Sequence, residues 1–324
     1  MTSQDEITRT ADRLRDAFGA AADVMTADTS LVRDSDADVI TLDISPVRIR
    51  GPKIGHAWKW LLPLTAAASV VVIVLAEVFI GHSGGNTLAT GSLPQIYSGS
   101  GKLHLVNVPA PDPAVLTSPG ERAADSRVVK VVGNAPRCDA AIEGSGFVYA
   151  PQHVITNAHV VAGVTQGQTV TTADGVTRRA RVVFYDPRAD IAVLDVPGLN
   201  LAPLRFSTQA KPGGDAVVAG YPLDHAFTAV PARIGQVLGV TGLDIYQSDQ
   251  VDRQVYQVRG AVEPGDSGGP LLSSEGTVDG VVFSAAGGVS DTAFVLTASE
   301  VQADANAGAN ATVPVSTQGC MPGR

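Results

Sequence analysis

The hexapeptide Gly265-Asp266-Ser267-Gly268-Gly269-Pro270 constrains this chain more than any other segment. Glycine at position 265 permits a backbone conformation that a side chain would resist. That conformation turns the N–H groups of Gly265 and Ser267 toward one point, where they can stabilise an oxyanion. The alternative is an accidental serine in a Gly-rich turn, and six specified residues in a row argue against it. The motif therefore predicts a nucleophilic Ser267 beside an oxyanion hole made of backbone.

A nucleophilic serine needs a base, and the sequence offers a histidine and an aspartate in suitable places. His159 follows the strand-like run His153-Val154-Ile155, and Asp190 stands before the apolar run at 191–194. His159 would accept the proton of Ser267, while Asp190 would fix the ring tautomer and stabilise the imidazolium. The order His, Asp, Ser is that of the chymotrypsin-type triad.

Two other carboxylates compete with Asp190 for the role of orienting the base. Asp186 precedes Pro187 and is typical of a turn. Asp195 lies five positions beyond Asp190, so strand alternation places it on the opposite face. Asp190 is therefore the predicted partner of His159.

With these residues in place, the chain resembles the trypsin-like serine peptidases through TNAHVV at 156–161, the Asp190 run and GDSGGP. It is more closely similar to the actinobacterial membrane-anchored, acid-resistance periplasmic serine proteases (MarP-like). The similarity runs from about Val106 to Cys320, which is the whole extracytoplasmic part. The shared segments are APRC (135–138), GSGFV (144–148), GYP (220–222), FTA (227–229), PARI (231–234) and FVLTA (294–298).

The resemblance implies a fold of two six-stranded antiparallel β-barrels with a short C-terminal helix. It also implies a triad of His159, Asp190 and Ser267, and no cofactor. Members of the MarP-like family usually carry several transmembrane helices of a colicin V production protein-like domain, whereas this chain has room for one such helix. The implied substrates are proteins of the cell envelope, processed under acid or oxidative stress. A catalytically silent scaffold or sensor that binds envelope partners is the alternative function.

In trypsin-like enzymes, the residue six positions before the nucleophile lies at the base of the specificity pocket. That residue is Ala261 here, so no strong preference for Lys or Arg is expected. Phe283 and Ala285 would line a small apolar pocket.

A run of 20 mostly apolar residues, from Leu61 to Ile80 with Glu77 as its one charge, predicts a transmembrane signal-anchor helix about 30 Å long. Lys and Arg residues stand just before this run, and none follows it until Lys102. Positive charge stays in the cytoplasm, so the N-terminus is predicted inside and the protease domain outside, in the periplasm. The basic residues before the run are Arg48, Arg50, Lys53 and Lys59.

The chain has two cysteines, Cys138 and Cys320, and both fall on the extracytoplasmic side, where disulfides persist. The resemblance implies one disulfide between them. Two free thiols are the alternative.

The remaining organisation follows from composition and periodicity. Residues 1–55 form an acidic cytoplasmic tail, with one amphipathic helix predicted at 5–22. This helix would dock a cytoplasmic partner or lie in a disordered tail, and the composition favours the tail. Residues 81–127, rich in Gly, Ser and Pro, are predicted to be an extracytoplasmic linker.

Residues 128–324 form the predicted protease domain. Short β-branched runs alternate there with turn signals. Thr297-Ala298-Ser299-Glu300 fits a capping box that begins a terminal helix. The histidines outside the triad show no metal-ligand spacing, so no metal site is predicted and these residues are assigned to the surface or the linker. The net charge of −9 argues against nucleic acid as a partner.

Overall fold

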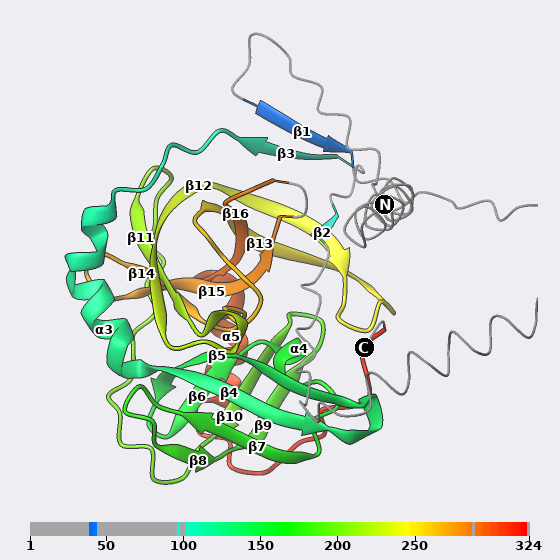
Figure 1. Cartoon of the computed structure of the whole chain (residues 1–324). Helices are drawn as coiled ribbons and strands as arrows, with labels where there is room; N and C mark the ends of the chain where they lie inside the picture. The colour runs from blue at the N-terminus through cyan, green and yellow to red at the C-terminus, as the bar shows by residue number, and fades with distance from the viewer. Residues whose placement is uncertain (1–38, 44–95, 98–101, 287–288, 323–324) are drawn as a thin grey trace, which may run out of the picture.

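The computed structural model describes residues 39–43, 96–97, 102–286 and 289–322 (Figure 1). Within these residues, two antiparallel sheets have seven strands each. The first has the strand order β8-β7-β4-β5-β6-β10-β9, and the second has the order β11-β14-β15-β16-β13-β12-β2. The second sheet closes on itself because β11 also pairs with β12.

The first sheet comes from the N-terminal half of the protease region. Its strands are rich in valine and isoleucine, which suit a pleated surface packed on one face. Val129, Val131, Val148 and Leu194 form its own buried cluster. The strands are β4 (Val128–Ala135), β5 (Ala140–Ala150), β6 (His153–Thr156), β7 (Gln166–Thr171), β8 (Thr177–Arg179), β9 (Arg181–Asp186) and β10 (Ile191–Asp195).

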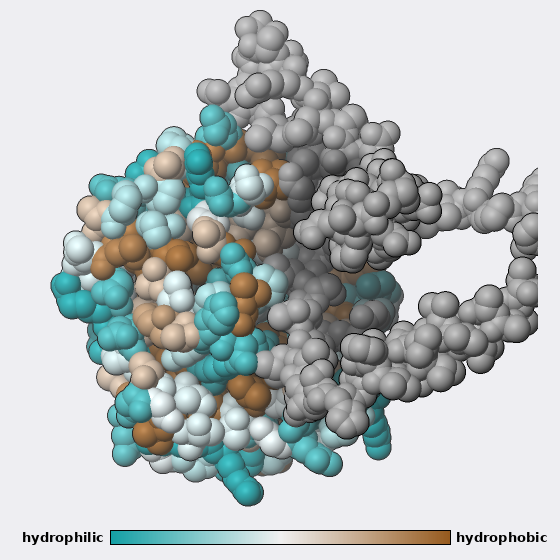
Figure 2. All heavy atoms as spheres, in the orientation of Figure 1, coloured by the Kyte–Doolittle hydropathy of each residue, from teal (hydrophilic) through white to brown (hydrophobic). Residues whose placement is uncertain are grey.

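The second sheet comes from the C-terminal half and has its own cluster around Val218, Ile234, Leu271 and Val295. A larger cluster joins residues of both sheets, including Phe147 and Leu296. On the face shown in Figure 2, the hydrophobic residues lie in separate groups among hydrophilic ones. The strands are β11 (Asp215–Gly220), β12 (Thr228–Leu243), β13 (Gln250–Arg259), β14 (Pro270–Ser273), β15 (Val278–Ala285), β16 (Thr292–Thr297) and β2 (Ile96–Tyr97).

The prediction of two antiparallel β-structures followed by a short helix is confirmed, and the second sheet closes over six strands as predicted, whereas the first sheet has seven strands. The first sheet has a seventh strand because β7 and β8 form a hairpin in a polar segment without a clear alternating pattern. The second sheet contains the six closed strands β11 to β16, and β2 adds a short seventh at its edge.

The second half of the predicted linker is folded onto the protease domain. It contains β3 (Lys102–Val106), the 3-10 helix η2 (Pro113–Thr117) and α3 (Pro119–Arg127). Asp112 and Ser118 cap the two helices with their side chains, and a proline follows each cap. Upstream, β1 (Val39–Asp43) pairs with β3. The Gly/Pro-rich composition thus includes helix-start signals as well as linker sequence.

The predicted transmembrane segment from Leu61 to Ile80 lies outside the described residues, as does the predicted amphipathic helix at 5–22. Among the helices that the structure does describe, none combines the length and the apolar character needed to cross a membrane.

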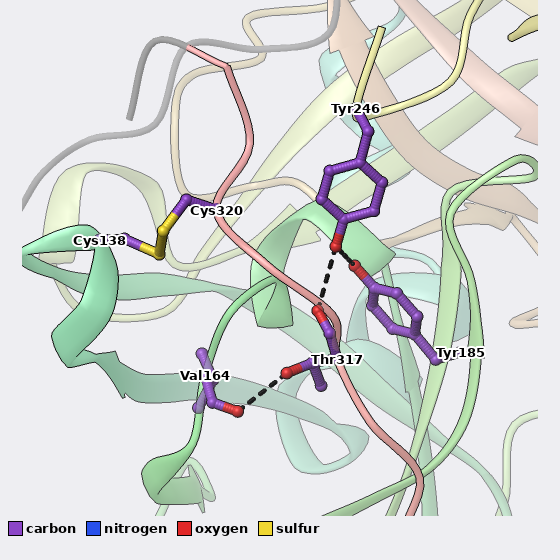
Figure 3. The surroundings of a disulfide bond; sticks show 6 residues. All are labelled: Cys138, Val164, Tyr185, Tyr246, Thr317 and Cys320. Carbon is purple, nitrogen blue, oxygen red and sulfur yellow. Dashed lines mark hydrogen bonds between the residues drawn. A yellow bond between two sulfur atoms is a disulfide. The ribbon is translucent and has the colours of Figure 1, made fainter. Parts of the chain in front are cut away.

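The C-terminal segment ties the two halves of the domain together. At the predicted capping box, the Thr297 hydroxyl caps α5 (Ala298–Gly308) by accepting from the N–H of Glu300 at 3.1 Å, while the Glu300 carboxylate accepts from the N–H of Gln254 at 2.9 Å. Beyond α5 the chain returns to the first sheet and ends in the Cys138–Cys320 disulfide, with the two Cα atoms 5.5 Å apart (Figure 3). The predicted disulfide is confirmed.

Candidate active site

His159 and Asp190 meet because of how two strands pair. β6 ends just before α4 (Ala158–Val161), which carries His159, and β10 begins just after Asp190. These strands are antiparallel neighbours, with Ala192 opposite Thr156. His159 Nδ1 lies 2.7 Å from Asp190 Oδ2, and the His159 backbone N–H donates to Asp190 Oδ1 at 2.8 Å. Both carboxylate oxygens therefore hold the histidine in place.

The backbone around Asp190 is itself fixed by a side chain. Asp190 has a φ of 62°, a left-handed conformation that aspartate tolerates better than most residues. Asn157 Nδ2 donates to the Asp190 carbonyl oxygen at 2.9 Å, and both residues are fully buried. Asn157 thus holds the carboxylate toward His159 from behind.

The two competing aspartates have other partners. Asp186 Oδ1 accepts from the N–H of Arg188 at 2.7 Å and from that of Ala189 at 3.2 Å, so it caps the turn before Asp190. Asp195 Oδ2 forms an ion pair with Arg181 at 2.6 Å. The structure therefore places Asp190, and neither alternative, against His159.

Ser267 lies beside the segment that leads into His159. The Ser145 N–H donates to the Ser267 carbonyl oxygen at 2.9 Å. The backbone of Gly268, with a φ of 84°, is so close to Thr156 that a Cβ there would lie 2.4 Å from the threonine hydroxyl. Ser267 Oγ is buried and has no hydrogen-bond partner among the described residues. Such nucleophile–base bonds often close only when substrate binds.

The oxyanion loop has the conformation that an open hole requires. Gly265 has a φ of 103°, and a Cβ there would lie 2.4 Å from the Tyr221 carbonyl oxygen, so only glycine fits. The Pro264 carbonyl oxygen accepts from the Leu223 N–H at 2.7 Å. Since N–H and C=O of a trans peptide point in opposite directions, the Gly265 N–H faces away from Leu223. No acceptor for the N–H of Gly265 or Ser267 is found among the described residues.

Ser145 joins the two sheets at this loop, a role that the sequence did not reveal. Its hydroxyl accepts from the Tyr221 N–H at 2.8 Å and donates to the Gly265 carbonyl oxygen at 2.7 Å. Its own carbonyl oxygen accepts from the Thr156 hydroxyl at 2.6 Å. Ser145 belongs to the GSGFV segment, but its partners lie too far away in the chain for any local pattern to show them.

Comparisons with known proteins give the same picture. A family model described as a trypsin-like peptidase domain matches residues 144–281. Serine protease Rv3671c of Mycobacterium tuberculosis is 46% identical over 236 residues, which are 72% of this chain and 59% of that relative. The crystal structure of the active form of that protease matches with a TM-score of 0.63 and 48% identity, covering 66% of this chain and 94% of the solved one. The chain belongs to the trypsin-like serine peptidases.

An inactive form of the same mycobacterial protease matches with a TM-score of 0.56 and 46% identity, over 62% of this chain and 98% of the other. This trypsin-like chain thus scores higher against the active form. The chain spans 59% of the full length of the mycobacterial relative.

Asp266 of this peptidase is a buried acid next to the nucleophile, and its side chain has no basic partner among the described residues. The residue is 4% exposed, and burial raises the pKa of its carboxyl to about 6. The Glu263 N–H donates to Asp266 Oδ2 at 3.0 Å, which opposes the rise, whereas the nearby Glu263 carboxylate adds to it.

The residues predicted to line the peptidase's specificity pocket do not share one environment. Ala261 is exposed, whereas Ala285 is half-buried. Phe283 is buried in the core, and the guanidinium carbon of Arg253 lies 5.3 Å from the centre of its ring. A cavity of about 890 Å³ lies instead between β7 to β9 and the C-terminal segment at 314–317.

One histidine outside the triad departs from its predicted place. His153 is only 6% exposed, and its two ring nitrogens lie 2.7 Å from the Pro151 carbonyl oxygen and 2.8 Å from that of Ala311. It therefore packs the tail after α5 against the start of β6. A strand-end histidine cannot be recognised as buried until the distant tail that covers it is known.

Proposed function

We propose that this chain is a serine endopeptidase that cleaves peptide bonds through an acyl-enzyme. Ser267 Oγ attacks the substrate carbonyl carbon as His159 Nε2 takes its proton, and the N–H groups of Gly265 and Ser267 stabilise the oxyanion. The C–N bond then breaks, and the leaving amine takes that proton from His159. A water molecule then attacks the acyl carbon while His159 takes one of its protons, and His159 passes that proton to Ser267 Oγ as the acyl group leaves as a carboxylic acid.

The observation that carries this proposal is the buried His159–Asp190 pair, in which both carboxylate oxygens hold the histidine. An imidazole held in this way has one tautomer, with Nδ1–H toward the carboxylate, so Nε2 is left as the base. Acyl transfer also requires an oxyanion hole. The N–H groups of Gly265 and Ser267, for which no acceptor is found among the described residues, support its presence.

Labelling with a fluorophosphonate probe tests the activity directly. The described domain should be labelled at Ser267, and Ser267→Ala should abolish both labelling and hydrolysis of a casein-derived peptide pool. Protein that folds but takes up no probe would instead support the alternative of a silent scaffold.

We further propose that the specificity pocket takes small apolar side chains, since alanine stands at position 261. A peptide library should show cleavage after such residues. A profile dominated by Arg or Lys at the cleaved position would contradict this.

The residues from Leu61 to Ile80 support a single-pass anchor with the protease domain outside the membrane and envelope proteins as its substrates. Such a span would separate β1 from β3, because Val39–Asp43 precede it and Lys102–Val106 follow it. The anchored chain must therefore give up this pairing. A cysteine introduced at Thr41 should resist a membrane-impermeant maleimide in intact cells, while one at the exposed Asp139 should react; labelling at both would contradict the anchor.

The resemblance to envelope proteases supports a role in processing envelope proteins under acid or oxidative stress. Comparing envelope proteomes of cells with wild-type protein and with Ser267→Ala, at neutral and acid pH, should reveal fragments that depend on Ser267. Identical fragment sets under every condition would contradict this role.

A further inference from the structure

Lys130 connects the first sheet to a turn of the second sheet beside the oxyanion loop. It lies on β4, and its Nζ forms an ion pair with Asp224 Oδ1 and a 3.3 Å hydrogen bond to the Asp224 carbonyl oxygen. Glu143, on the adjacent β5, has a carboxylate oxygen 3.6 Å from the same Nζ. The side chains of Lys130 and Glu143 are 18% and 4% exposed. The ammonium group therefore lies between two carboxylates where the sheets meet.

The turn that Lys130 reaches has an unfavourable backbone. It is the 3-10 helix η4 (Pro222–Asp224), in which Leu223 has a φ of 52° and Asp224 a φ of 61°. A left-handed conformation is strained for a residue such as leucine and persists only where the surroundings hold it. Leucine gains nothing from a local side-chain hydrogen bond there. The Lys130 contacts to the Asp224 side chain and carbonyl supply such a hold.

The turn at 222–224 contacts the oxyanion loop and determines its conformation. The Leu223 N–H donates to the Pro264 carbonyl oxygen at 2.7 Å, which keeps that oxygen out of the oxyanion site. The backbone of Gly265 packs on the same turn, where a Cβ would lie 2.9 Å from the Leu223 nitrogen and 3.1 Å from Pro222 Cα. If the turn relaxed, the Pro264–Gly265 peptide would lose its anchor. Rotation of that peptide would replace the Gly265 N–H in the hole by a carbonyl oxygen.

We propose that Lys130 is a positioning residue for the oxyanion hole, holding the strained turn at 222–224 so that the Gly265 N–H faces the reacting carbonyl. The inference rests on the proposed peptidase function. It assigns a role in the reaction to a lysine that touches no substrate.

The kinetic test measures the effect of Lys130→Met in a protein that already carries Glu143→Gln. Replacing Lys130 alone would leave the buried Glu143 unpaired, which can unfold the protein. Glu143→Gln is therefore the reference, and Lys130→Met is added to it. The loss of one oxyanion donor lowers kcat by about 10²–10³-fold, so partial loss of the hole should lower kcat by about 10–100-fold with KM within about twofold. Affinity for a peptide aldehyde, whose adduct oxygen occupies the hole, should fall in parallel.

Two controls separate positioning from general stability. Lys130→Arg, which still donates to Asp224, should retain most of the kcat. Arg181→Met removes a different ion pair of the same sheet, with Asp195 at 2.6 Å, and should leave kcat unchanged. An unchanged kcat in the Lys130→Met variant, or an equal loss in Arg181→Met, would overturn the proposal.

A structural readout separates this proposal from the proposed function. Crystal structures of Ser267→Ala, with and without the Glu143→Gln and Lys130→Met pair, need no activity. The Pro264 carbonyl should leave Leu223 and turn into the oxyanion site only when Lys130 is absent. An unmoved peptide would refute positioning by Lys130, whereas failure of the wild-type protein to react with the probe would refute peptidase activity alone.

Discussion

Ser145 shows how much one buried side chain can connect. Its hydroxyl bridges Tyr221 and Gly265, its N–H binds the Ser267 carbonyl, and its own carbonyl binds Thr156. These contacts link the first sheet to the loop that carries the nucleophile. The candidate triad residues could be found from the sequence because each of them stands in a recognisable local motif. Ser145 and Lys130 were not, since their roles depend on partners about 76 to 120 positions away.

Replacing Ser145 by alanine should impair the reaction more than the binding of substrate. The variant leaves the Tyr221 N–H and the Gly265 carbonyl without a buried partner, which costs about 1–3 kcal/mol for each such group. We expect kcat to fall about 10-fold or more, with a lower midpoint of urea unfolding. Ser273→Ala, which removes hydroxyl contacts to Thr277 and Glu275 at a turn, is the matched control and should retain kcat. Equal kcat in both variants would contradict this account.

Asp190→Asn tests the role of the Asp190 carboxylate while leaving its backbone conformation in place. Asparagine tolerates the left-handed conformation at a φ of 62°, so the fold should persist. Its amide would donate to His159 Nδ1 and so impose the wrong tautomer on the ring. We expect kcat to fall by about 10⁴-fold while the unfolding midpoint changes little. Steady-state kinetics alongside thermal unfolding separate the two quantities, and a kcat within tenfold of wild type would exclude Asp190 from the triad.

At the scale of elements, the strands with clear β-branched runs were predictable, and those interrupted by small residues were not. β12 runs unbroken from Thr228 to Leu243 although it contains Pro231, Gly235 and Gly239. These residues signal breaks in an isolated sequence, yet pairing with β11 over 228–233 and with β13 over 233–243, with a register shift at Gly235, holds the strand together. Tertiary pairing therefore overrides local propensity in β12.

The C-terminal segment is held by more than its disulfide. Thr317 Oγ1 donates to the Val164 carbonyl at 2.9 Å, and the Tyr246 hydroxyl donates to the Thr317 carbonyl at 3.0 Å while contacting the Tyr185 hydroxyl at 2.6 Å (Figure 3). This tail therefore lies against residues from both halves of the domain.

Removing the disulfide should lower the free energy of unfolding of the domain, while the hydrogen bonds of its tail remain. The loop between Cys138 and Cys320 spans 182 positions, for which the chain-entropy model gives roughly 5 kcal/mol, with measured losses often smaller. Cys138→Ser with Cys320→Ser should lower the free energy of unfolding by about 2–5 kcal/mol. Urea unfolding of oxidised wild type, reduced wild type and the double variant measures this. A double variant as stable as the oxidised protein would refute it.

For the whole molecule, buried acids make stability depend on pH. Asp279 is 4% exposed, and burial raises the pKa of its carboxyl to about 7, with a smaller contribution from Glu275. Asp266 behaves in the same way, with a pKa of about 6. A raised pKa means that the folded state keeps a proton that the unfolded chain releases. Each acid therefore adds stability below about pH 4 that is lost as the pH rises through its folded pKa.

Asp279→Asn should flatten the pH dependence of stability. Wild type should lose on the order of 3 kcal/mol through this group between about pH 4 and about pH 7, and the amide removes that loss because it does not ionise. Unfolding midpoints measured across this range should converge at acid pH and favour the variant at neutral pH. Asp139→Asn, at an exposed site with a φ of 50°, is the control and should follow wild type. Parallel curves for all three proteins would contradict the assignment.

The Cys138–Cys320 bridge turns nearly the entire protease domain into a covalent ring. A single backbone cut in any loop of that ring, whether by another copy of the enzyme or by a contaminant, leaves both fragments attached. A nicked molecule would then migrate at its full mass on a gel run without reductant. Damage that would be obvious in a chain lacking the bridge becomes visible here only after thiol treatment.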